Sequence, residues 1–351
     1  MVHLTSLLAL SACIAHATSS VIGTRSSSTK TTRQAGSLPS SFEWSSSGAL
    51  VGPKDDDRHL AGIKDPSVIY YEDKYHIFAS TAQQSGYNLV YITFSDPADA
   101  PSADFFYLDQ SPIGTGYRAA PEVFFFEPQG LWYLVYQNGN AAYSTNPDIN
   151  DPAGWTAPQT FYSEIPATVT ENMGDGNWVD MWVICDEVNC HLFSSDDNGH
   201  LYRSQTAVAD FPNGFNEPEI PLSDPDKNKL FEAANVYTYG ANQYLLIIEA
   251  IGSGGRYFRS WTAESLDGDW TPLADTEENP FAGANNVAFE GGAWTASISH
   301  GEVVRTEVDQ KLAISPCKIS YLYQGVDPTA EGDYNSLPWK LGLLTQTNSA
   351  C

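Results

Sequence analysis

Three acidic residues open strand-like runs that lie far apart in this sequence: Asp65 in KDPSVIYY, Asp180 in VDMWVIC and Glu232 in FEAANVY. If the fold gathered these side chains around one enclosed channel, burial and mutual repulsion would separate their pKa values. One protonated carboxylic acid beside one ionised carboxylate is what cleavage of a glycosidic bond requires. The chain holds 43 acidic residues, so three solvated loop carboxylates are the alternative. Whether the acids share a channel or lie on separate loops depends on the secondary structure that carries them.

Those elements recur along the chain. Five segments share one plan: a small or acidic residue, an aromatic and β-branched run, a tight turn and a second apolar run. They start about 50 to 60 positions apart, at Asp65, Ala120, Asp180, Glu232 and Gly283. Each has the composition of a hairpin, and further strand-like pieces such as YNLVYITFS and RYFRSWTA lie between them. We therefore predict an all-β fold, a five-bladed β-propeller with about four strands per blade. A two-sheet sandwich would leave the regular spacing unexplained.

In a propeller, the first strand of every blade lines the central channel, and all first strands begin on the same face. The five start residues should therefore ring one mouth of the channel and place Asp65, Asp180 and Glu232 in one pocket. Trp and Tyr side chains around them would offer flat apolar faces to sugar rings. This arrangement favours an active site at one mouth of the channel over scattered loop carboxylates.

The composition narrows the class of partner. The chain has 351 residues, of which 43 are acidic and 17 basic, for a formal net charge of −26. Such a balance disfavours nucleic acid and anionic membrane surfaces as partners, because both need basic side chains. Aromatic residues make up 13% of the chain and charged residues only 17%. This composition suits an extracellular β protein whose partner is neutral and polar, such as carbohydrate, and we expect a monomer.

The N-terminus has the features of an export signal. Residues 1–17 contain an apolar stretch that ends in Ala-His-Ala, a pattern suited to signal peptidase, with a buried helix as the alternative. Residues 18–37 are rich in Ser and Thr and are expected to form a disordered linker or propeptide. Residues 38–351 would then form one catalytic domain. No later segment has the roughly 18 apolar residues of a membrane span, so the sequence predicts a secreted protein.

Four cysteines follow the expected signal peptide: Cys185, Cys190, Cys317 and Cys351. An even number in an exported chain indicates two disulfides, with three possible connectivities. Cys185 and Cys190 flank a hairpin turn, so a local bridge is sterically reasonable there, and the other two would then hold the C-terminal tail. A zinc site is the competing interpretation, but the paired Cys-x-x-Cys spacing is missing.

Five stretches carry a family resemblance: GIKDPSVIYYEDKYHIFAS, WVDMWVICDEVNCHLFSSDDNGHLYRS, LFEAANVYTYGANQYLLIIEAIG, ISHGEVVR and DYNSLPWKLGLLT. The chain resembles glycoside hydrolase family 62 over residues 38–345. That resemblance implies a five-bladed β-propeller and a secreted α-L-arabinofuranosidase, which removes arabinose side chains from arabinoxylan with inversion at the anomeric centre. It implies no organic cofactor.

The resemblance also implies roles for the acids. Asp65 matches the general base, which activates a water molecule opposite the leaving oxygen. Glu232 matches the general acid, and Asp180 matches the third acid, which orients the sugar and raises the pKa of the proton donor. Glu249 is the rival for the general acid, because it ends the second strand of its hairpin and returns to the same face. The register across the repeats favours Glu232, because Asp65 and Asp180 occupy the equivalent position.

His300 in ISHGE is the one candidate metal ligand. It matches a family histidine that helps to bind a structural calcium ion near the channel floor. Calcium prefers oxygen ligands, so a lone histidine is a poor calcium signal by itself. A hydrogen-bonded buried histidine is the alternative.

Six residues are candidate substrate contacts: Glu249, if it is not the acid, and five others. Tyr334 and Asn335 in DYNSLPW match family residues that contact the xylan backbone, although turn formation also explains them. Lys64 is a candidate partner for arabinose hydroxyls or for the neighbouring base. Arg256 would clamp either the substrate or the rival glutamate, and Tyr117 precedes the second hairpin at the same mouth.

Two other functions fit the same plan. Related propellers of glycoside hydrolase family 43 include xylosidases and arabinanases with three acids. A carbohydrate-binding propeller without catalysis would instead repeat its sugar sites around the blades, whereas here the acids are unequal and confined to three repeats.

Overall fold

The computed structural model describes residues 36–349 and 351. The expected signal peptide, residues 1–17, and nearly all of the expected linker, residues 18–37, lie outside the described residues. No helix in the described part of the chain is long and apolar enough to cross a membrane.

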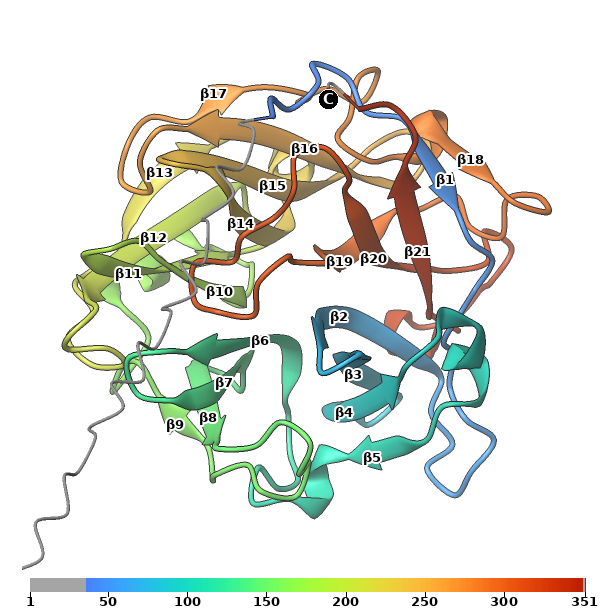
Figure 1. The fold of residues 1–351 in the computed structure, drawn as a ribbon, viewed down its shortest axis with the longest axis horizontal. Coiled ribbons are helices and arrows are strands. Elements are labelled where there is room, and N and C mark those ends of the chain that lie inside the picture. The colour runs from blue at the N-terminus through green and yellow to red at the C-terminus, as the bar shows by residue number, and fades with distance from the viewer. Residues whose placement is uncertain (1–35, 350) are drawn as a thin grey trace, which may run out of the picture. The chain divides into compact units, whose positions relative to one another are not determined.

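The strands form five sheets arranged about a common centre, which confirms the predicted five-bladed propeller (Figure 1). The first two blades contain β2 (Gly62–Tyr71), β3 (Lys74–Gln83), β4 (Gly86–Phe94) and β5 (Phe105–Tyr107), then β6 (Ala119–Phe126), β7 (Leu131–Gln137), β8 (Ala141–Asn146) and β9 (Gln159–Thr160). The next two contain β10 (Val179–Cys185), β11 (Asn189–Ser195), β12 (His200–Ala207) and β13 (Glu219–Ser223), then β14 (Glu232–Gly240), β15 (Gln243–Ile251), β16 (Arg256–Ala263) and β17 (Thr271–Pro272). Within each of these blades the four strands are antiparallel neighbours in chain order.

The fifth blade closes the ring with strands from both ends of the described chain. Its order is β18 (Val287–Phe289), β1 (Trp44–Ser46), β21 (Lys340–Gln346), β20 (Ser320–Gly325) and β19 (Ser299–Val303). Strand β1 pairs parallel to β18 and antiparallel to β21, so an early segment is held between two late ones. The prediction that the fifth inner strand starts at Gly283 is therefore wrong. The segment after Gly283 forms an outer edge strand, and β19 is the inner strand.

Burial falls from the centre of the blades to their rim. All seven residues of the inner strand β10 are buried, whereas no residue of the outer strand β13 is fully buried. Apolar runs such as VDMWVIC suit the inner position because both faces pack against neighbouring blades. The turns follow local chemistry: Glu72 and Asp73 connect β2 to β3 with φ of 50° and 60°, values that acidic turn residues tolerate.

Each inner strand has a β-bulge near its start, where the pairing with the second strand of the blade shifts. In four blades the residue at this bulge has a positive φ, between 48° and 58°: Asp65, Ala120, Asp180 and Ala233. Bulges re-aim side chains at the rims of sheets. The equivalent of Asp65 in the fourth blade is thus Ala233 rather than Glu232, which stands one position earlier. The register argument for Glu232 was therefore off by one residue.

Hydrogen bonds link the bulges around the ring. The bulge N–H of each blade donates to a side chain of the preceding blade at 2.7–2.8 Å, in the pairs Asp65–Gln324, Ala120–Ser80, Asp180–Gln137, Ala233–Asp180 and His300–Glu249. Four of the acceptors stand on the second strand of their blade. In the third blade that second-strand position is Ser195, and the carboxylate of Asp180 accepts the bond instead. Asp180, one of the three predicted acids, therefore also links the third blade to the fourth by a hydrogen bond.

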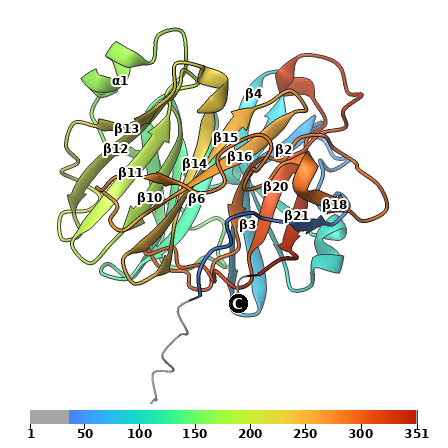
Figure 2. The ribbon, with the colours of Figure 1, turned by 90° about the horizontal axis from the view of Figure 1, so that it is seen from above.

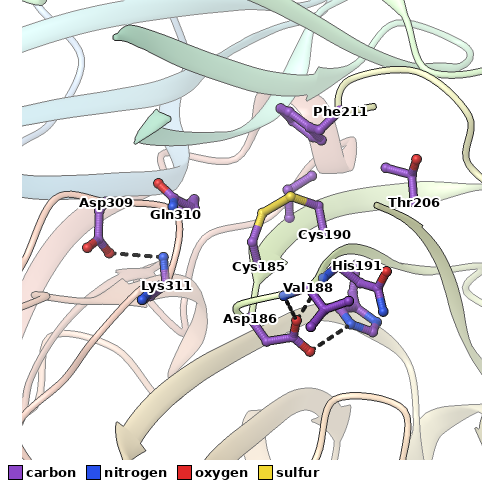
Figure 3. Close-up of a disulfide and its surroundings, with 12 residues drawn as sticks. Cys185, Asp186, Val188, Cys190, His191, Thr206, Phe211, Asp309, Gln310 and Lys311 are labelled. Carbon is purple, nitrogen blue, oxygen red and sulfur yellow. Dashed lines mark hydrogen bonds and ion pairs between the residues drawn. A yellow bond between two sulfur atoms is a disulfide. The ribbon is translucent and has the colours of Figure 1, made fainter. Parts of the chain in front are cut away.

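Two disulfides form, in the pairing that the hairpin argument favoured. Cys185 and Cys190 face each other across β10 and β11 with Cα atoms 3.9 Å apart (Figure 3). Beside this bridge, Asp186 accepts the N–H groups of Val188 and Asn189 at 2.7 Å. Cys317 and Cys351 join positions 34 residues apart and hold the C-terminal residue to the domain. Seen from above, the C-terminal residue lies at the opposite end of the molecule from α1 (Ala167–Asn172), the single α-helix in the described part of the chain (Figure 2).

Candidate active site

A pocket of about 690 Å³ opens where the inner strands begin, next to the segment that contains α1. The three predicted acids, Asp65, Asp180 and Glu232, all line it although they come from three different blades. Five of the other predicted residues line the same pocket: Lys64, Tyr117, Arg256, His300 and Tyr334. Asn335 and Glu249 stand behind this lining. The structure therefore brings together, at one mouth of the channel, acidic residues that lie more than 150 positions apart in the sequence.

Asp65 is held between two basic side chains. Its Oδ1 lies 3.6 Å from Lys64 Nζ and 3.5 Å from His300 Nδ1. Burial disfavours the charged ammonium of Lys64, but Asp65 and other nearby groups outweigh burial and raise the pKa of Lys64. The ammonium therefore stays charged beside the carboxylate, as one of the two roles expected for Lys64 requires.

Aromatic rings enclose the same lysine. Lys64 Nζ lies 5.0 Å from the ring centre of Tyr87, 4.6 Å from that of Tyr334 and 5.7 Å from that of Trp339. Such faces attract a cation and fix its direction. Tyr87 in turn donates a hydrogen bond to Asn335, so Asn335 supports the wall of the pocket from behind.

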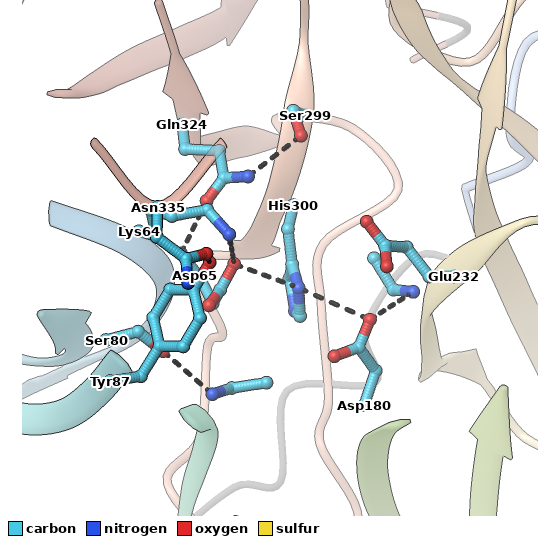
Figure 4. Close-up of polar contacts among 12 residues, drawn as sticks. Lys64, Asp65, Ser80, Tyr87, Asp180, Glu232, Ser299, His300, Gln324 and Asn335 are labelled. Carbon is cyan, nitrogen blue, oxygen red and sulfur yellow. Dashed lines mark hydrogen bonds and ion pairs between the residues drawn. The ribbon is translucent and has the colours of Figure 1, made fainter. Parts of the chain in front are cut away.

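Asp180 is a buried acid at the centre of the group. Its Oδ2 accepts the N–H of Ala233 at 2.7 Å and lies 3.6 Å from His300 Nδ1. Burial, followed by repulsion from Glu232 and Asp65, raises the pKa of Asp180 well above its usual range. Figure 4 shows His300 between Asp65 on one side and Asp180 and Glu232 on the other.

Glu232 is paired with a cation. Arg256 Nη1 donates to Glu232 Oε1 and also to Glu249 Oε1. Burial raises the pKa of Glu232, but Arg256, a hydrogen bond with Asp197 and Lys64 together lower it to about 2. Glu232 is thus ionised in the free pocket, and its side chain keeps 19% of its surface exposed.

Glu249, the rival for the general acid, occupies a different position. Its side chain is fully buried, Oε2 accepts the N–H of His300 at 2.7 Å, and the other oxygen is bound by Arg256. Burial raises the pKa of Glu249. Because both of its oxygens are engaged behind the pocket lining, Glu249 is placed to orient Arg256 and the fifth inner strand rather than to reach a substrate.

The calcium prediction finds no support around His300. Within residues 36–349 and 351, no three or more His, Cys, Asp or Glu side chains are grouped so as to hold a metal ion. Calcium takes six to eight oxygen ligands, whereas the ring nitrogen of His300 is directed at the carboxylates of Asp65 and Asp180. The residues present do not fit a calcium ion, and we derive no step through one.

Tyr334 and Tyr117 stand at the rim of the pocket. Tyr334 begins a 3-10 turn (Tyr334–Ser336), is 40% exposed, and lies over the Arg256 guanidinium at 5.6 Å. Tyr117 is 41% exposed, and its hydroxyl accepts a hydrogen bond from Gln137. Both rings therefore present accessible surface beside the acids.

Sequence reasoning missed several pocket residues, among which Asp197 carries a carboxyl group. It sits in the turn between β11 and β12 and lines the pocket beside Glu232. Asn177, Trp178 and Gln137 also line the pocket. The SSDDNG turn could have indicated Asp197, because a chain leaving the second strand of a blade returns to the mouth.

Comparison with known proteins decides the family. The family model described as "Glycosyl hydrolase family 62" matches residues 43–345. The chain belongs to glycosyl hydrolase family 62. This membership favours the family 62 prediction over the family 43 alternative, and the site described above is therefore that of a glycosyl hydrolase.

Relatives support the same family assignment. A Cellvibrio japonicus protein, "Alpha-L-arabinofuranosidase C", is 44% identical over 311 residues, which are 88% of this chain and 47% of that relative. This family 62 chain thus spans about half the length of the curated relative. The catalytic domain of a Coprinopsis cinerea GH62 α-L-arabinofuranosidase is 70% identical with a TM-score of 0.89, covering 90% of this chain and 100% of its own. A GH62 hydrolase solved in complex with xylotriose is 60% identical with a TM-score of 0.85, covering 88% and 98%.

Proposed function

We propose that this chain is an inverting α-L-arabinofuranosidase that removes arabinofuranosyl side chains from arabinoxylan. The observation that carries the proposal is the convergence of Asp65, Asp180 and Glu232 on one pocket at the channel mouth. The similar C. cinerea and C. japonicus proteins are named as arabinofuranosidases, and a similar hydrolase binds xylotriose, a fragment of a xylan backbone.

In the proposed reaction, Asp65 takes a proton from a water molecule as that water attacks the anomeric carbon of arabinofuranose. The bond to the xylose oxygen breaks on the opposite face, and Glu232 supplies the proton to this leaving oxygen. Lys64 and His300 flank Asp65, with their nitrogen atoms 3.6 Å and 3.5 Å from its Oδ1. Asp180, buried between the two sides, orients the sugar.

The rim residues would hold the polymer. Tyr334 and Tyr117 present exposed rings at the mouth, and such rings suit the apolar faces of pyranose units. Asn335 keeps Tyr87 in place, and Arg256 positions Glu232. We assign the xylan backbone to this rim and the cleaved arabinose to the interior.

The non-catalytic alternative needs equivalent sites around the ring. At the position just before each bulge the five blades instead carry unlike residues: Lys64, Ala119, Val179, Glu232 and Ser299. A repeated sugar site would require similar side chains there, so these differences favour catalysis at a single mouth.

Secretion is part of the proposal. Two disulfides among the described residues suit an oxidising compartment, in keeping with a signal peptide at 1–17, a linker at 18–37 and a monomeric catalytic domain at 38–351.

The test is incubation with wheat arabinoxylan and, separately, with debranched arabinan, followed by proton NMR. Release of β-arabinofuranose first, from arabinoxylan only, is the expected result. An initial α-product would contradict inversion, and release of xylose would place the activity with the family 43 enzymes. The Asp65→Asn variant is the inactive control.

A further inference from the structure

Asp197 is an acid of the pocket to which the proposed reaction so far assigns no role. It stands at the turn between β11 and β12 with φ of 56°. It lines the same pocket as Glu232. Asp and Asn tolerate this backbone conformation better than most residues, and an Asp197→Asn exchange therefore keeps the turn.

The two oxygens of Asp197 have different surroundings. Oδ2 accepts a hydrogen bond from Asn177 Nδ2 at 3.2 Å. Oδ1 is buried, and no N–H or O–H group of the described residues donates to it. A hydrogen bond joins the Asp197 and Glu232 carboxyl groups, and two carboxyl groups can share such a bond only when one of them carries a proton. The geometry therefore calls for one proton on this pair.

The charged neighbours decide which partner holds the proton. Arg256 binds Glu232, and Lys64 also acts on Glu232, whereas Asp197 faces the acids Glu232 and Asp180. Burial, followed by Glu232, raises the pKa of Asp197 to about 8, while Arg256 outweighs burial and lowers that of Glu232 to about 2. The contact with Arg256 therefore favours the charge on Glu232 and the shared proton on Asp197.

We propose that Asp197 is a positioning residue that stores the proton which Glu232 delivers to the leaving oxygen. This inference rests on the proposed function. As the glycosidic bond breaks, the electron pair goes to the xylose oxygen, the Asp197 proton passes to Glu232, and Glu232 passes it on to that oxygen and is again a carboxylate. Asp197 is left as a carboxylate. The proton that Asp65 took from water returns to the pair through solvent, so protons balance over one turnover.

Storage on Asp197 explains how an acid can work beside a permanent cation. Arg256 orients Glu232 but also stabilises its charged form, which by itself would leave no proton to donate at neutral pH. A second carboxyl, away from the arginine, keeps the proton within one hydrogen bond of the acid. Approach of the leaving oxygen to Glu232 then draws the proton across.

The experiment compares pH–rate profiles of wild type, Asp197→Asn and Asn177→Ala on arabinoxylo-oligosaccharide and on 4-nitrophenyl α-L-arabinofuranoside. For wild type the activity on the oligosaccharide should fall at alkaline pH near the pKa of about 8. In Asp197→Asn, kcat on the oligosaccharide should fall on the order of 10²-fold at neutral pH. The 4-nitrophenyl substrate should be much less affected, because its phenolate leaves without a proton.

The two variants should move the alkaline limb in opposite directions. Asp197→Asn removes the stored proton and should shift the limb to lower pH by about one unit or more. Asn177→Ala removes a hydrogen bond that lowers the pKa of Asp197, so its limb should shift to higher pH. Asp73→Asn makes the same exchange at a positive-φ turn between β2 and β3, and its profile should match wild type.

The outcomes separate the two proposals. If wild type releases no arabinose from arabinoxylan, the proposed function fails and this inference falls with it. Suppose that wild type is active but Asp197→Asn lowers kcat equally on both substrates and leaves the alkaline limb of the pH–rate profile unmoved. Asp197 then only shapes the turn, and the inference is overturned. If Asp197→Asn does not fold, an alkaline shift in Asn177→Ala supports the inference, and an unshifted limb there overturns it.

Discussion

Two groups of acidic residues lie on different inner strands, and only one of the groups faces a pocket. Asp65, Asp180 and Glu232 stand at the mouth. Glu122 and Glu302 follow two positions after the bulge residues of their own strands, deeper in the channel, and both are completely buried. We call Glu122, Glu302 and Arg305 the inner cluster.

The inner cluster is occupied with holding strands together. Glu302 accepts hydrogen bonds from Ser67 and from the N–H of Val68, and its other oxygen pairs with Arg305 Nε at 2.7 Å. Glu122 accepts the N–H of Val183 at 2.6 Å. Burial raises the pKa of both acids. A strongly raised carboxyl pKa is therefore no sign of catalysis by itself. A catalytic carboxyl must also adjoin a space that a substrate can occupy.

The difference between the acids at the mouth and the inner cluster can be tested by mutation, and the largest expected effect is on kcat at the mouth. Asp65→Asn removes the proposed base, so kcat on arabinoxylan should fall on the order of 10⁴-fold. The buried Lys64 loses a counter-ion in this variant, so the thermal unfolding midpoint should also fall, and kcat is measured per folded molecule. A variant that lost stability but retained activity would reverse the roles given to the two groups.

The matching change in the inner cluster is Glu302→Gln. It leaves the Arg305 charge buried without its counter-ion, and loss of one partner of a buried pair costs roughly 3–5 kcal/mol of unfolding free energy. Urea unfolding measures this loss, while kcat per folded molecule should stay unchanged. Glu187→Gln, in an exposed pair with Lys311, is the control and should cost less than about 1 kcal/mol. A large drop in kcat with intact stability would place the inner cluster in the reaction.

A third comparison concerns the two glutamates that share Arg256. Glu232→Gln should lower kcat on arabinoxylan on the order of 10²-fold and much less on an aryl arabinofuranoside, because only the poor leaving group needs the acid. Glu249→Gln should affect both substrates alike, through the loosened Arg256 and His300. If only Glu249→Gln loses activity on the poor leaving group, the assignment of the acid is wrong.

The smallest expected effect is at the far end of the third blade. Replacing both Cys185 and Cys190 with Ala opens a short loop, and loop-closure entropy gives a loss of about 2 kcal/mol. Activity should not change, because the bridge lies at the end of β10 away from the acids. Denaturant unfolding beside a kinetic assay checks both expectations, and a changed KM would contradict the separation between the two ends of the blade.

The sequence was most informative about local structure. Alternating turns and apolar runs predicted the hairpins of the first four blades, because each hairpin pairs residues close in the chain. The fifth blade was wrongly assigned, since GANNVAFEGGAWTASISHG has hairpin composition although β18 pairs with β1, more than 240 positions away. Strand pairing at such separation leaves no local signal.

The site divides in the same way. Asp65, Asp180 and Glu232 were predicted to meet at one mouth, and they do, although a bulge displaces Glu232 by one position from the supposed register. Asp197 was missed although its turn follows a second strand that returns to the mouth, because the residue types of that turn do not show that it lies beside Glu232.

Sequence alone determined the repeat, the hairpins, the disulfide-capable cysteines and the identity of the acids, because these depend on residue types and on neighbours along the chain. Only the tertiary structure decided which acid is charged. That depends on burial and on ions a few ångströms away, and Asp197 lies in a turn of the third blade whereas Glu232 lies on a strand of the fourth. The same residue type, glutamate, holds strands together inside the channel and is a proposed reactive group at its mouth.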